Sequence, residues 1–458
     1  MLEKLKNNSD VIYKKTKANC TICYQEHLCN ILEFMKDLFP RIEADLTSDL
    51  DDIIPGLCKK IEADEDNIIQ LVFCGLLICE RNHQYYVIDL SKTPSRPTGD
   101  SIAEPDNVFG SRDGFVENFK ENIALIRTRV KDDRLRIDTV TVGKRSKTIL
   151  SLLSIQDIHN EEFKKEILHQ LEEIDIDAII CIEDVMSYFQ NKHLFPTFHY
   201  VGTPDTACRR LYNGEFILVI DRICIVICLP TTLAYTSRLK IDALNMPFFS
   251  FFERWFIILS AVFSIFFCGI LSAFSSIQMD SLSLTVLSTL KISQTGIYLP
   301  IFVEILIVLG MFELYYLIGF RQSKVTVSST IVLIGGLIVG QNLISSGIAG
   351  VFIMTATAIC FMLSFVVSSN VTNIIAISLA RLYILFSSLI YGLFGILLAS
   401  VILACYLYNQ KTLGVRYFYP FLPFHLKGIH KFFLASSDLK LDERDHPLKV
   451  GNKIRRRI

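Results

Sequence analysis

The sequence predicts a cytoplasmic α/β amino-terminal domain, built from two subdomains, followed by an all-α polytopic transmembrane domain. Residues 255–279, 325–380 and 382–410 contain no charged side chain. Each run is long enough for the roughly 20 apolar residues that one helix needs to cross a bilayer. The residues ahead of them mix short apolar runs with amphipathic patterns, which is typical of an α/β domain. Because the first 30 residues contain no apolar signal-peptide core, we expect this domain to stay in the cytoplasm.

These patterns divide the chain into four parts. We expect a helical amino-terminal extension over 1–66, the α/β domain over 67–247, the transmembrane helices over 248–410 and a basic cytoplasmic tail over 411–458. A net charge of −1 argues against a nucleic-acid partner, because no basic excess is present to neutralise phosphates. Thirteen cysteines, an odd number, suit a reducing compartment in which thiols stay free.

The α/β domain is expected to begin with strands at 67–77 and 84–90. An amphipathic helix then runs from about residue 115 to 130, with Ser111 or Asp113 as its N-cap. Further strands are expected at 137–142, 149–155, 178–182, 216–220 and 223–229, and a helix at 161–174. The segment 149–182 therefore predicts a strand–helix–strand unit with a buried parallel pair. Similar residues at 79–89 and 211–221 suggest two subdomains, each ending in a hairpin.

The membrane block predicts spans at 256–277 and 297–319, and two more crossings between 325 and 380, broken near residues 345–347. The run 374–408 is too long for one span and short for two. Aromatic residues at 248–255 are typical of the membrane–water interface. The basic tail favours a cytoplasmic end, and hence an even number of crossings, so four and six both stay open.

Few polar side chains interrupt these spans. A charge in hydrocarbon costs several kcal/mol, so such residues usually face a bundle interior or a wet path. Glu304 and Glu313 lie nine positions apart, on opposite sides of one helix, and either line an ion path, contact a helix or reach the interface. Gly336 and Gly340 form a G-x-x-x-G pattern for close helix packing. The candidate intramembrane residues are Glu304, Glu313, Gln341, Asn342 and Arg381.

Enzyme signatures are not found. The chain has no G-x-G-x-x-G after a strand, no phosphate-binding G-x-x-x-x-G-K-[ST], no H-E-x-x-H and no G-x-S-x-G. Cys20, Cys23, His27 and Cys29 could supply four zinc ligands, but all four lie within ten residues and no second zinc knuckle follows. Ordinary reduced cysteines are therefore favoured over zinc. We therefore expect no enzyme activity, no cofactor and no metal.

Several segments of the chain resemble a known family. Residues 108–117 and 122–129, together with 142–148, 174–177, 203–205 and 335–341, are similar to the GerA family of spore germination proteins, A-type subunits. Residues 110–115, the short link before 299–302 and the segment 419–424 are closer to its SpoVAF branch. The family motif in the soluble domain comprises Gly110, Ser111, Arg112, Asp113, Gly114, Phe115, Glu117, Asn122, Arg127 and Arg129.

The resemblance implies a subunit of a homo-oligomeric, pentameric ion channel in the inner membrane of the spore, with a cytoplasmic amino-terminal domain, in contact with membrane lipid and a B-type germination subunit. Such a channel would release monovalent cations and promote germination. The alternatives are the A subunit of a nutrient germinant receptor acting with B- and C-type subunits, and a non-conducting membrane scaffold. The chain departs from the family pattern at Phe109, at residues 201–205, at Asp221-Arg222 and at Tyr315-Tyr316-Leu317. These departures argue against receptor-type subunit contacts more than against the family fold.

Overall fold

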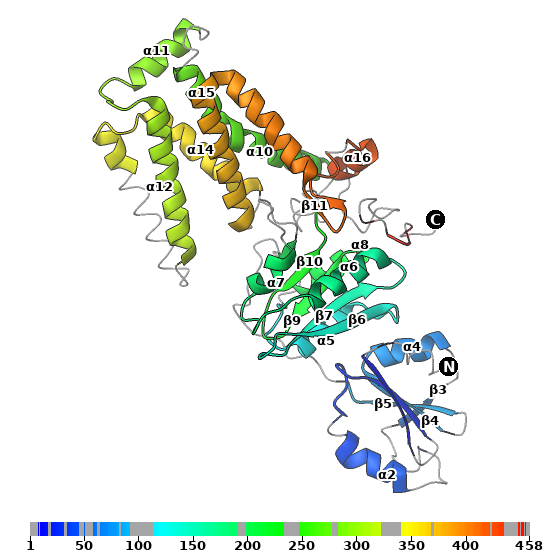
Figure 1. The fold of residues 1–458 in the computed structure, drawn as a ribbon. Coiled ribbons are helices and arrows are strands. Elements are labelled where there is room, and N and C mark those ends of the chain that lie inside the picture. Colours follow the sequence, from blue (N-terminus) through cyan, green and yellow to red (C-terminus); the bar gives the residue numbers. More distant parts are fainter. Residues whose placement is uncertain are drawn as a thin grey trace.

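In the computed structural model two soluble subdomains are followed by a helical domain (Figure 1). The structure describes residues 8, 10–16, 20–31, 34–44, 50, 58–61, 65–81, 84–91, 113–189, 198–232, 247–276, 283–321, 340–367, 371–421, 424–434, 448, 450–452 and 454. The predicted fold class, an α/β region followed by apolar helices, is confirmed.

The first subdomain contains an antiparallel five-stranded sheet in the order β1-β2-β4-β5-β3. Its strands are β1 (Val11–Lys15), β2 (Thr21–Gln25), β3 (Cys58–Ile61), β4 (Leu76–Arg81) and β5 (Gln84–Asp89). Alternation along β2 sends Cys23 toward α4 (Glu65–Phe73). Ile22 and Tyr24 face η2 (Phe34–Leu38), which leads into α2 (Phe39–Ala44).

Two predictions for this region are wrong. Residues 1–66 do not form a helical extension, because three of the five strands lie there. The predicted strand 67–77 is instead mostly helix α4, followed by the first residues of β4. Its buried residues Ile68 and Val72 are four positions apart, the spacing of one helix face, which the short apolar run concealed.

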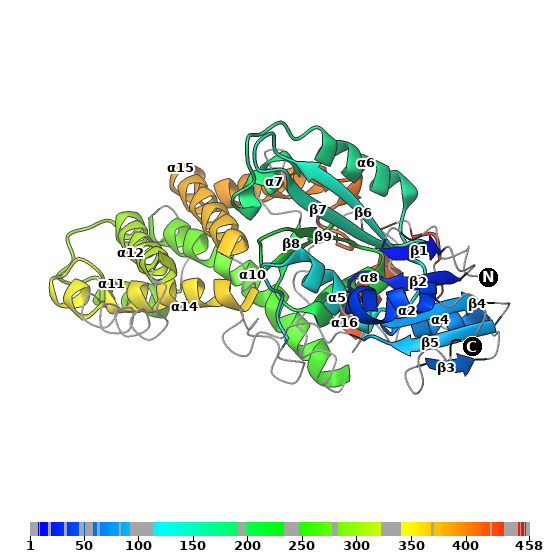
Figure 2. The same cartoon turned by 90° about the horizontal axis from the view of Figure 1, so that it is seen from below.

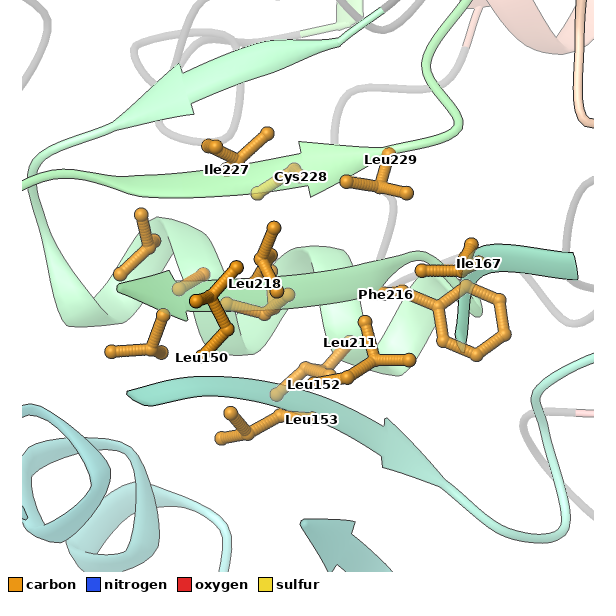
Figure 3. Packing of buried hydrophobic residues seen from close by; sticks show 14 of the residues in the cluster. Leu150, Leu152, Leu153, Ile167, Leu211, Phe216, Leu218, Ile227, Cys228 and Leu229 are labelled. Carbon is orange, nitrogen blue, oxygen red and sulfur yellow. The ribbon is translucent and has the colours of Figure 1, made fainter. Parts of the chain in front are cut away.

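The second subdomain has another antiparallel sheet, in the order β6-β7-β9-β10-β8. Its strands are β6 (Leu135–Val142), β7 (Thr148–Ile155), β8 (His199–Val201), β9 (Phe216–Ile220) and β10 (Val226–Leu229), and its helices are α5 (Phe119–Arg129), α6 (Glu161–Glu172), α7 (Ile182–Phe189) and α8 (Pro204–Asn213). Figure 3 shows side chains of β7, β9 and β10 interleaving in its core, with Leu211 from α8 and Ile167 from α6.

The expected parallel strand pair within 149–182 is wrong. Residues 178–181 form no strand, and α7 begins at Ile182. The Asp184 carboxylate accepts hydrogen bonds from the backbone N–H groups of Ile180 and Cys181, at 2.8 and 2.9 Å. These bonds start a helix where the apolar run alone predicted a strand.

The two subdomains share one topology. In each, the strands occur along the sheet in the order first, second, fourth, fifth, third. A glycine with positive φ, Gly75 (87°) or Gly214 (97°), separates the helix before the fourth strand from that strand. The structure therefore has two similar subdomains that each end in a hairpin, but the first begins near residue 11, outside the range 67–247 in which both were expected. The sequence comparison aligned 79–89 with 211–221 one strand out of step. Residues 84–89 form the fifth strand of the first subdomain, whereas 216–220 form the fourth strand of the second.

The helical domain contains α10 (Pro247–Ser276), α11 (Leu284–Ser293), α12 (Ile301–Arg321), α14 (Val351–Val367) and α15 (Val371–Asn409). By length and composition, Phe251–Ser275, Ile301–Ile318 and Asn373–Asn409 are apolar enough to cross a membrane, and Val351–Val367 is a shorter apolar helix. The predicted crossing near Gly336 lies outside the described residues.

Helix α15 is broken at Gly392, whose φ of 59° and ψ of −137° are not helical. The chain folds back there into two helical segments (Figure 1). The Ser387 hydroxyl donates to the Gly395 carbonyl at 2.9 Å across the turn. This turn explains why 374–408 was too long for one span and short for two.

Contacts between aromatic rings fix the relative direction of α12 and α14. The rings of Phe312 and Phe361 stack at 5.4 Å, and those of Tyr316 and Phe365 meet at 5.4 Å one turn further along both helices. The two helices therefore run in the same direction. Figures 1 and 2 show them side by side.

Helix α10 runs the opposite way. Ser264 contacts both Ser364 of α14 and Arg381 of α15, and a Cβ on Gly269 would meet Ile384. Later residues of α10 therefore contact later residues of the first α15 segment, so these two helices are parallel. In contrast, Cys268 of α10 packs in one cluster with Cys360 of α14, ahead of Ser364, so these two helices are antiparallel.

Beyond α15 the chain forms β11 (Lys411–Thr412), β12 (Val415–Arg416) and α16 (Leu426–Leu434). The segment predicted as a basic tail returns to the second subdomain, where Val415, Leu448 and Val450 are buried in its core. The Gly451 N–H donates to the Ile158 carbonyl at 3.0 Å. Part of the tail is therefore integral to the soluble domain.

Candidate functional site

Arg381 lies fully buried where α10, α14 and α15 meet. Its Nε donates to the Ser264 carbonyl at 2.7 Å, and Nη2 donates to the Ser264 hydroxyl at 2.7 Å, to the Cys360 carbonyl at 3.3 Å and to the Ser364 hydroxyl. We call these four residues the Arg381 cluster. Hydrogen bonds from a charged donor are the strong kind, so this guanidinium fastens three helices together.

Small side chains make the Arg381 cluster possible. The hydroxyls of Ser264 and Ser364 lie 2.8 Å apart, so two helix backbones approach closely beside the guanidinium. Nη1 of Arg381 has no hydrogen-bond partner among the described residues. Sequence reasoning missed both serines, although buried small polar residues recur along α10 at 260, 264, 272 and 275.

Glu304, in the first turn of α12, is also fully buried. Its Oε1 accepts the backbone N–H of Gly350, and its Oε2 has no partner within the described part of the chain. A Cβ on Gly350 would lie 2.9 Å from the Ser293 carbonyl oxygen, so glycine lets the backbone approach the carboxylate. The helix amino terminus favours a negative charge at this position.

Glu313 is half-buried further along α12. Its Oε1 accepts a hydrogen bond from the Ser378 hydroxyl of α15. Since Ser378 lies one turn before Arg381, adjacent turns of α15 contact α12 and the α10–α14 pair. The two carboxylates of α12 have different partners, as their spacing required.

The remaining intramembrane candidates lie apart from this buried group. Gln341 and Asn342 are exposed, so they do not belong to the Arg381 cluster. Gly340 lies close to the Met354 side chain of α14, whose Cε would be 3.2 Å from an added Cβ. Gly336 lies outside the described residues.

In the soluble domain, Arg127 of the family motif joins the two subdomains. It is fully buried, and its Nε and Nη2 donate to the two carboxylate oxygens of Asp10 at 2.7 and 2.9 Å. It also donates to the carbonyls of Asp132 and Leu135, both at 2.8 Å, and lies 4.7 Å from the Phe73 ring centroid. Burial lowers the pKa of the Arg127 guanidinium, and Asp10 opposes that effect. No pattern in the sequence pointed to Asp10.

Other motif residues hold the entry to α5. Asn122 is buried and accepts from the Val116 N–H at 2.8 Å while donating to the Val116 carbonyl at 2.6 Å. Arg129 donates to Asp113 at 2.9 Å and to Asp205. These contacts show the motif residues in structural roles.

The prediction that Ser111 or Asp113 caps α5 is wrong, because Asn118 is the N-cap. The helix begins at Phe119, and the Asn118 side chain accepts from the Lys120 N–H at 3.0 Å. Asp113 lies too early in the chain and binds Arg129 instead. Gly110, Ser111 and Arg112 lie outside the described residues. Phe115 is buried after Gly114, and the Glu117 carbonyl accepts from the Arg222 N–H at 2.8 Å.

The cysteines of the first subdomain are placed as core residues. Cys20, Cys23 and Cys29 are free and buried. Burial raises the pKa of the Cys23 and Cys29 thiols to about 12, which disfavours the thiolate that a metal requires. In the part of the chain that the structure describes, no three His, Cys, Asp or Glu residues are arranged to hold a metal ion.

Comparison with known proteins finds relatives with names from spore germination and sporulation. Residues 1–446 match a family model described as Bacillus/Clostridium GerA spore germination protein. Spore germination protein XA of Bacillus anthracis is 29% identical over 369 residues, covering 80% of this chain and 74% of that protein. Stage V sporulation protein AF of Bacillus subtilis (strain 168) is 26% identical over 400 residues, covering 85% and 79%.

This chain is also similar to a solved structure. The amino-terminal domain of the A subunit of the Bacillus megaterium spore germinant receptor GerK3 covers 50% of this chain and 91% of its own, with 22% identity and a TM-score of 0.36.

Proposed function

This chain belongs to the GerA family of spore germination proteins, and from that premise we propose that it is a subunit of an oligomeric ion channel in the inner membrane of the spore. The channel releases monovalent cations and promotes germination, in the manner implied by the SpoVAF branch. Its partners are further copies of this chain, as a pentamer, and a B-type germination subunit.

The observation that supports conduction is Glu304. A carboxylate that is fully buried among apolar helices is costly, and such residues usually face an ion path or a partner. One of its oxygens has no partner among the described residues, and carboxylate oxygen is a ligand for hard cations. Arg381 has a different role, since its hydrogen bonds hold helices together.

Helix directions support six crossings. Helix α12 ends and the parallel α14 begins on opposite sides of the bundle, so we propose a further crossing in the interval between Arg321 and Val351. At about 1.5 Å per residue that interval is long enough for one crossing. The break at Gly392 divides α15 into two helical segments, which we propose as two further crossings. Six crossings would put both ends of the chain on one side of the membrane, and we propose that this side is the cytoplasm.

Replacing Glu304 with Gln tests the channel. Glu304→Gln keeps the shape and the acceptor for Gly350 but removes the charge, so we expect slower potassium efflux from germinating spores and altered flux in proteoliposomes. Glu253→Gln, the same change at the start of α10, is the matched control. Unchanged flux in both systems, with altered assembly of the complex alone, would favour the non-conducting scaffold.

A nutrient germinant receptor subunit is the second candidate. Its support is the 29% identity to spore germination protein XA over most of both chains. Affinity purification of the tagged chain from spores separates the two roles. Recovery with both B- and C-type subunits, and loss of the response to one nutrient on deletion, would favour the receptor.

Labelling with a membrane-impermeant maleimide tests the topology. Tyr298 precedes α12 and Ser345 precedes α14, and both are exposed. We expect Tyr298→Cys and Ser345→Cys to react from outside intact cells, while native Cys181 of the soluble domain reacts only after permeabilisation. Labelling of the two new cysteines from opposite sides would exclude six crossings.

A further inference from the structure

Helix α16, which follows the last long helix, is fastened to the first turns of α10. Arg254 is almost fully buried, and its Nη1 donates to the Phe432 carbonyl while the guanidinium lies 5.8 Å from the Phe432 ring centroid. The Phe433 ring lies 5.8 Å from that of Phe251 and 6.1 Å from that of Trp255. A segment far along the chain is thus held against the start of the first candidate span.

The start of α16 is also ordered by local contacts. The Nδ1 of His425 accepts from the Gly428 N–H at 3.0 Å and lies 3.2 Å from the Tyr419 hydroxyl. A Cβ on Gly428 would lie 2.8 Å from Pro420. The helix therefore has a defined position against the preceding turn and α10.

Large apolar side chains remain exposed on both elements. On α10 they are Phe252 (64%), Trp255 (51%) and Phe256 (46%), and at the start of α16 they are Phe424 (73%), two residues before the helix, and Leu426 (72%), its first residue. We call these five residues the aromatic platform. Exposed groups of this kind mark a surface that is covered by a partner or a membrane.

The α10 part of the aromatic platform identifies its occupant. Its exposed stripe continues at helical spacing through Leu259, Val262 and Phe263 along the candidate span Phe251–Ser275. The surface that would face lipid tails therefore passes without interruption into the aromatic platform. Aromatic side chains are enriched where a span leaves the hydrocarbon for the headgroups.

The charge of the segment around α16, residues 411–437, favours an anionic membrane surface. Residues 411–437 contain four cations, Lys411, Arg416, Lys427 and Lys431, and no Asp or Glu. Each juxtamembrane cation favours an anionic membrane surface about fivefold. An amphipathic helix with basic residues binds such a surface in its plane.

We infer that α16 and the first turns of α10 form an anchor that lies in the headgroup region of the cytoplasmic leaflet and prefers anionic phospholipid. The aromatic platform lies at the boundary between headgroups and acyl chains. The Arg254 contact keeps the two helices in register there, so the end of the last crossing and the beginning of the first are held at one depth.

Trp255 is the only tryptophan of the chain, so intrinsic fluorescence reports this position. In the full-length protein in phosphatidylcholine vesicles, we expect strong quenching by lipid brominated near the glycerol end of the acyl chain and weak quenching by lipid brominated at the chain terminus. The reverse order would overturn the assigned depth.

The second measurement moves the probe to α16. In a Trp255→Phe background, Phe424→Trp should be quenched by the same shallow bromine label, and more strongly when the label is on phosphatidylglycerol than on phosphatidylcholine. Ile180→Trp, an exposed apolar position of the soluble domain, is the control that no brominated lipid should quench. Combined Lys427→Gln and Lys431→Gln should reduce the preference for phosphatidylglycerol severalfold.

Two results would refute the anchor. If Phe424→Trp fluorescence is quenched by no brominated lipid but is protected from aqueous iodide, a protein covers the aromatic platform. If it is quenched by iodide as fully as the control at 180, the surface is open to water and α16 does not lie in the interface.

Discussion

Removing the Asp10 carboxylate should loosen the two soluble subdomains from each other. In Asp10→Ala the Arg127 guanidinium keeps its two carbonyl partners but loses both carboxylate bonds, at 2.7 and 2.9 Å, in a site with no solvent exposure. Leaving a buried charge without its counter-charge costs about 3–5 kcal/mol. Hydrogen exchange of the amides of β1 and β2 in the full-length protein should accelerate by about two to four orders of magnitude, if they exchange through separation of the subdomains.

The chain offers a matched control across the same junction. Lys120 of α5 and Glu26 after β2 form an ion pair at 3.0 Å, but their side chains are 54% and 37% exposed. Exposed pairs contribute about 0–1 kcal/mol and weaken in salt. Glu26→Ala should therefore change the exchange of β1 and β2 less than about fivefold. Equal effects of Asp10→Ala and Glu26→Ala would refute the assignment of Arg127 as the main tie.

Three further outcomes are expected. Burial lowers the pKa of His27 below its ordinary value of 6.5, so the unfolded chain binds a proton at His27 more readily than the folded chain does. The folded state therefore has its full stability above about pH 6.5 and loses stability as the pH falls. His27→Gln should flatten this pH dependence of the free energy of unfolding, measured with denaturant. Gly214→Ala should destabilise the second subdomain by at least about 1–2 kcal/mol in the same assay, because φ is 97° and the new Cβ would meet Val450. A hydrogen bond with Asp184 raises the pKa of the Cys181 thiol, so Asp184→Asn should speed its alkylation at mildly alkaline pH.

Each of these outcomes has a clear contrary result. Around His27 the charged groups are Asp10, Glu26, Lys120 and Arg127, and unchanged pH dependence in the variant would assign the acid sensitivity to them. Wild-type stability of the Gly214→Ala variant would show that Val450 of the tail does not pack against Gly214 in the core of the second subdomain. Slower alkylation of Cys181 would show that Asp184 does not suppress its thiolate.

Patterns that depend on local spacing were predictable from the sequence. The Phe216–Ile220 strand follows from a short apolar run, the α6 helix from its amphipathic spacing and the second apolar helix from its apolar length, and the structure has all three. The sequence did not predict how strands pair, because a fully apolar strand has the same composition whether it pairs parallel or antiparallel. The segment 178–182 shows this, since two hydrogen bonds to Asp184 decided its conformation.

Contacts between distant segments could not be predicted from one sequence. Arg381 was singled out as a lone cation in an apolar run, and its burial agrees with that interpretation. Its partners Ser264 and Ser364 lie 117 and 17 positions away and are ordinary residues in apolar helices. Asp10 likewise lies 117 positions from Arg127. Such pairs depend on how elements pack and leave no periodic signal.

The second subdomain is tied to the membrane helices by more than the chain that leads into α10. The hairpin β11–β12 follows directly after α15 and buries Val415 in the core of that subdomain, where Leu413 also packs. Tyr417, just beyond, packs with Ala376 of the first α15 segment. Because packed interfaces of this kind move as units, a shift of the second subdomain would displace both segments of α15, and with them Arg381 and the three helices that it joins.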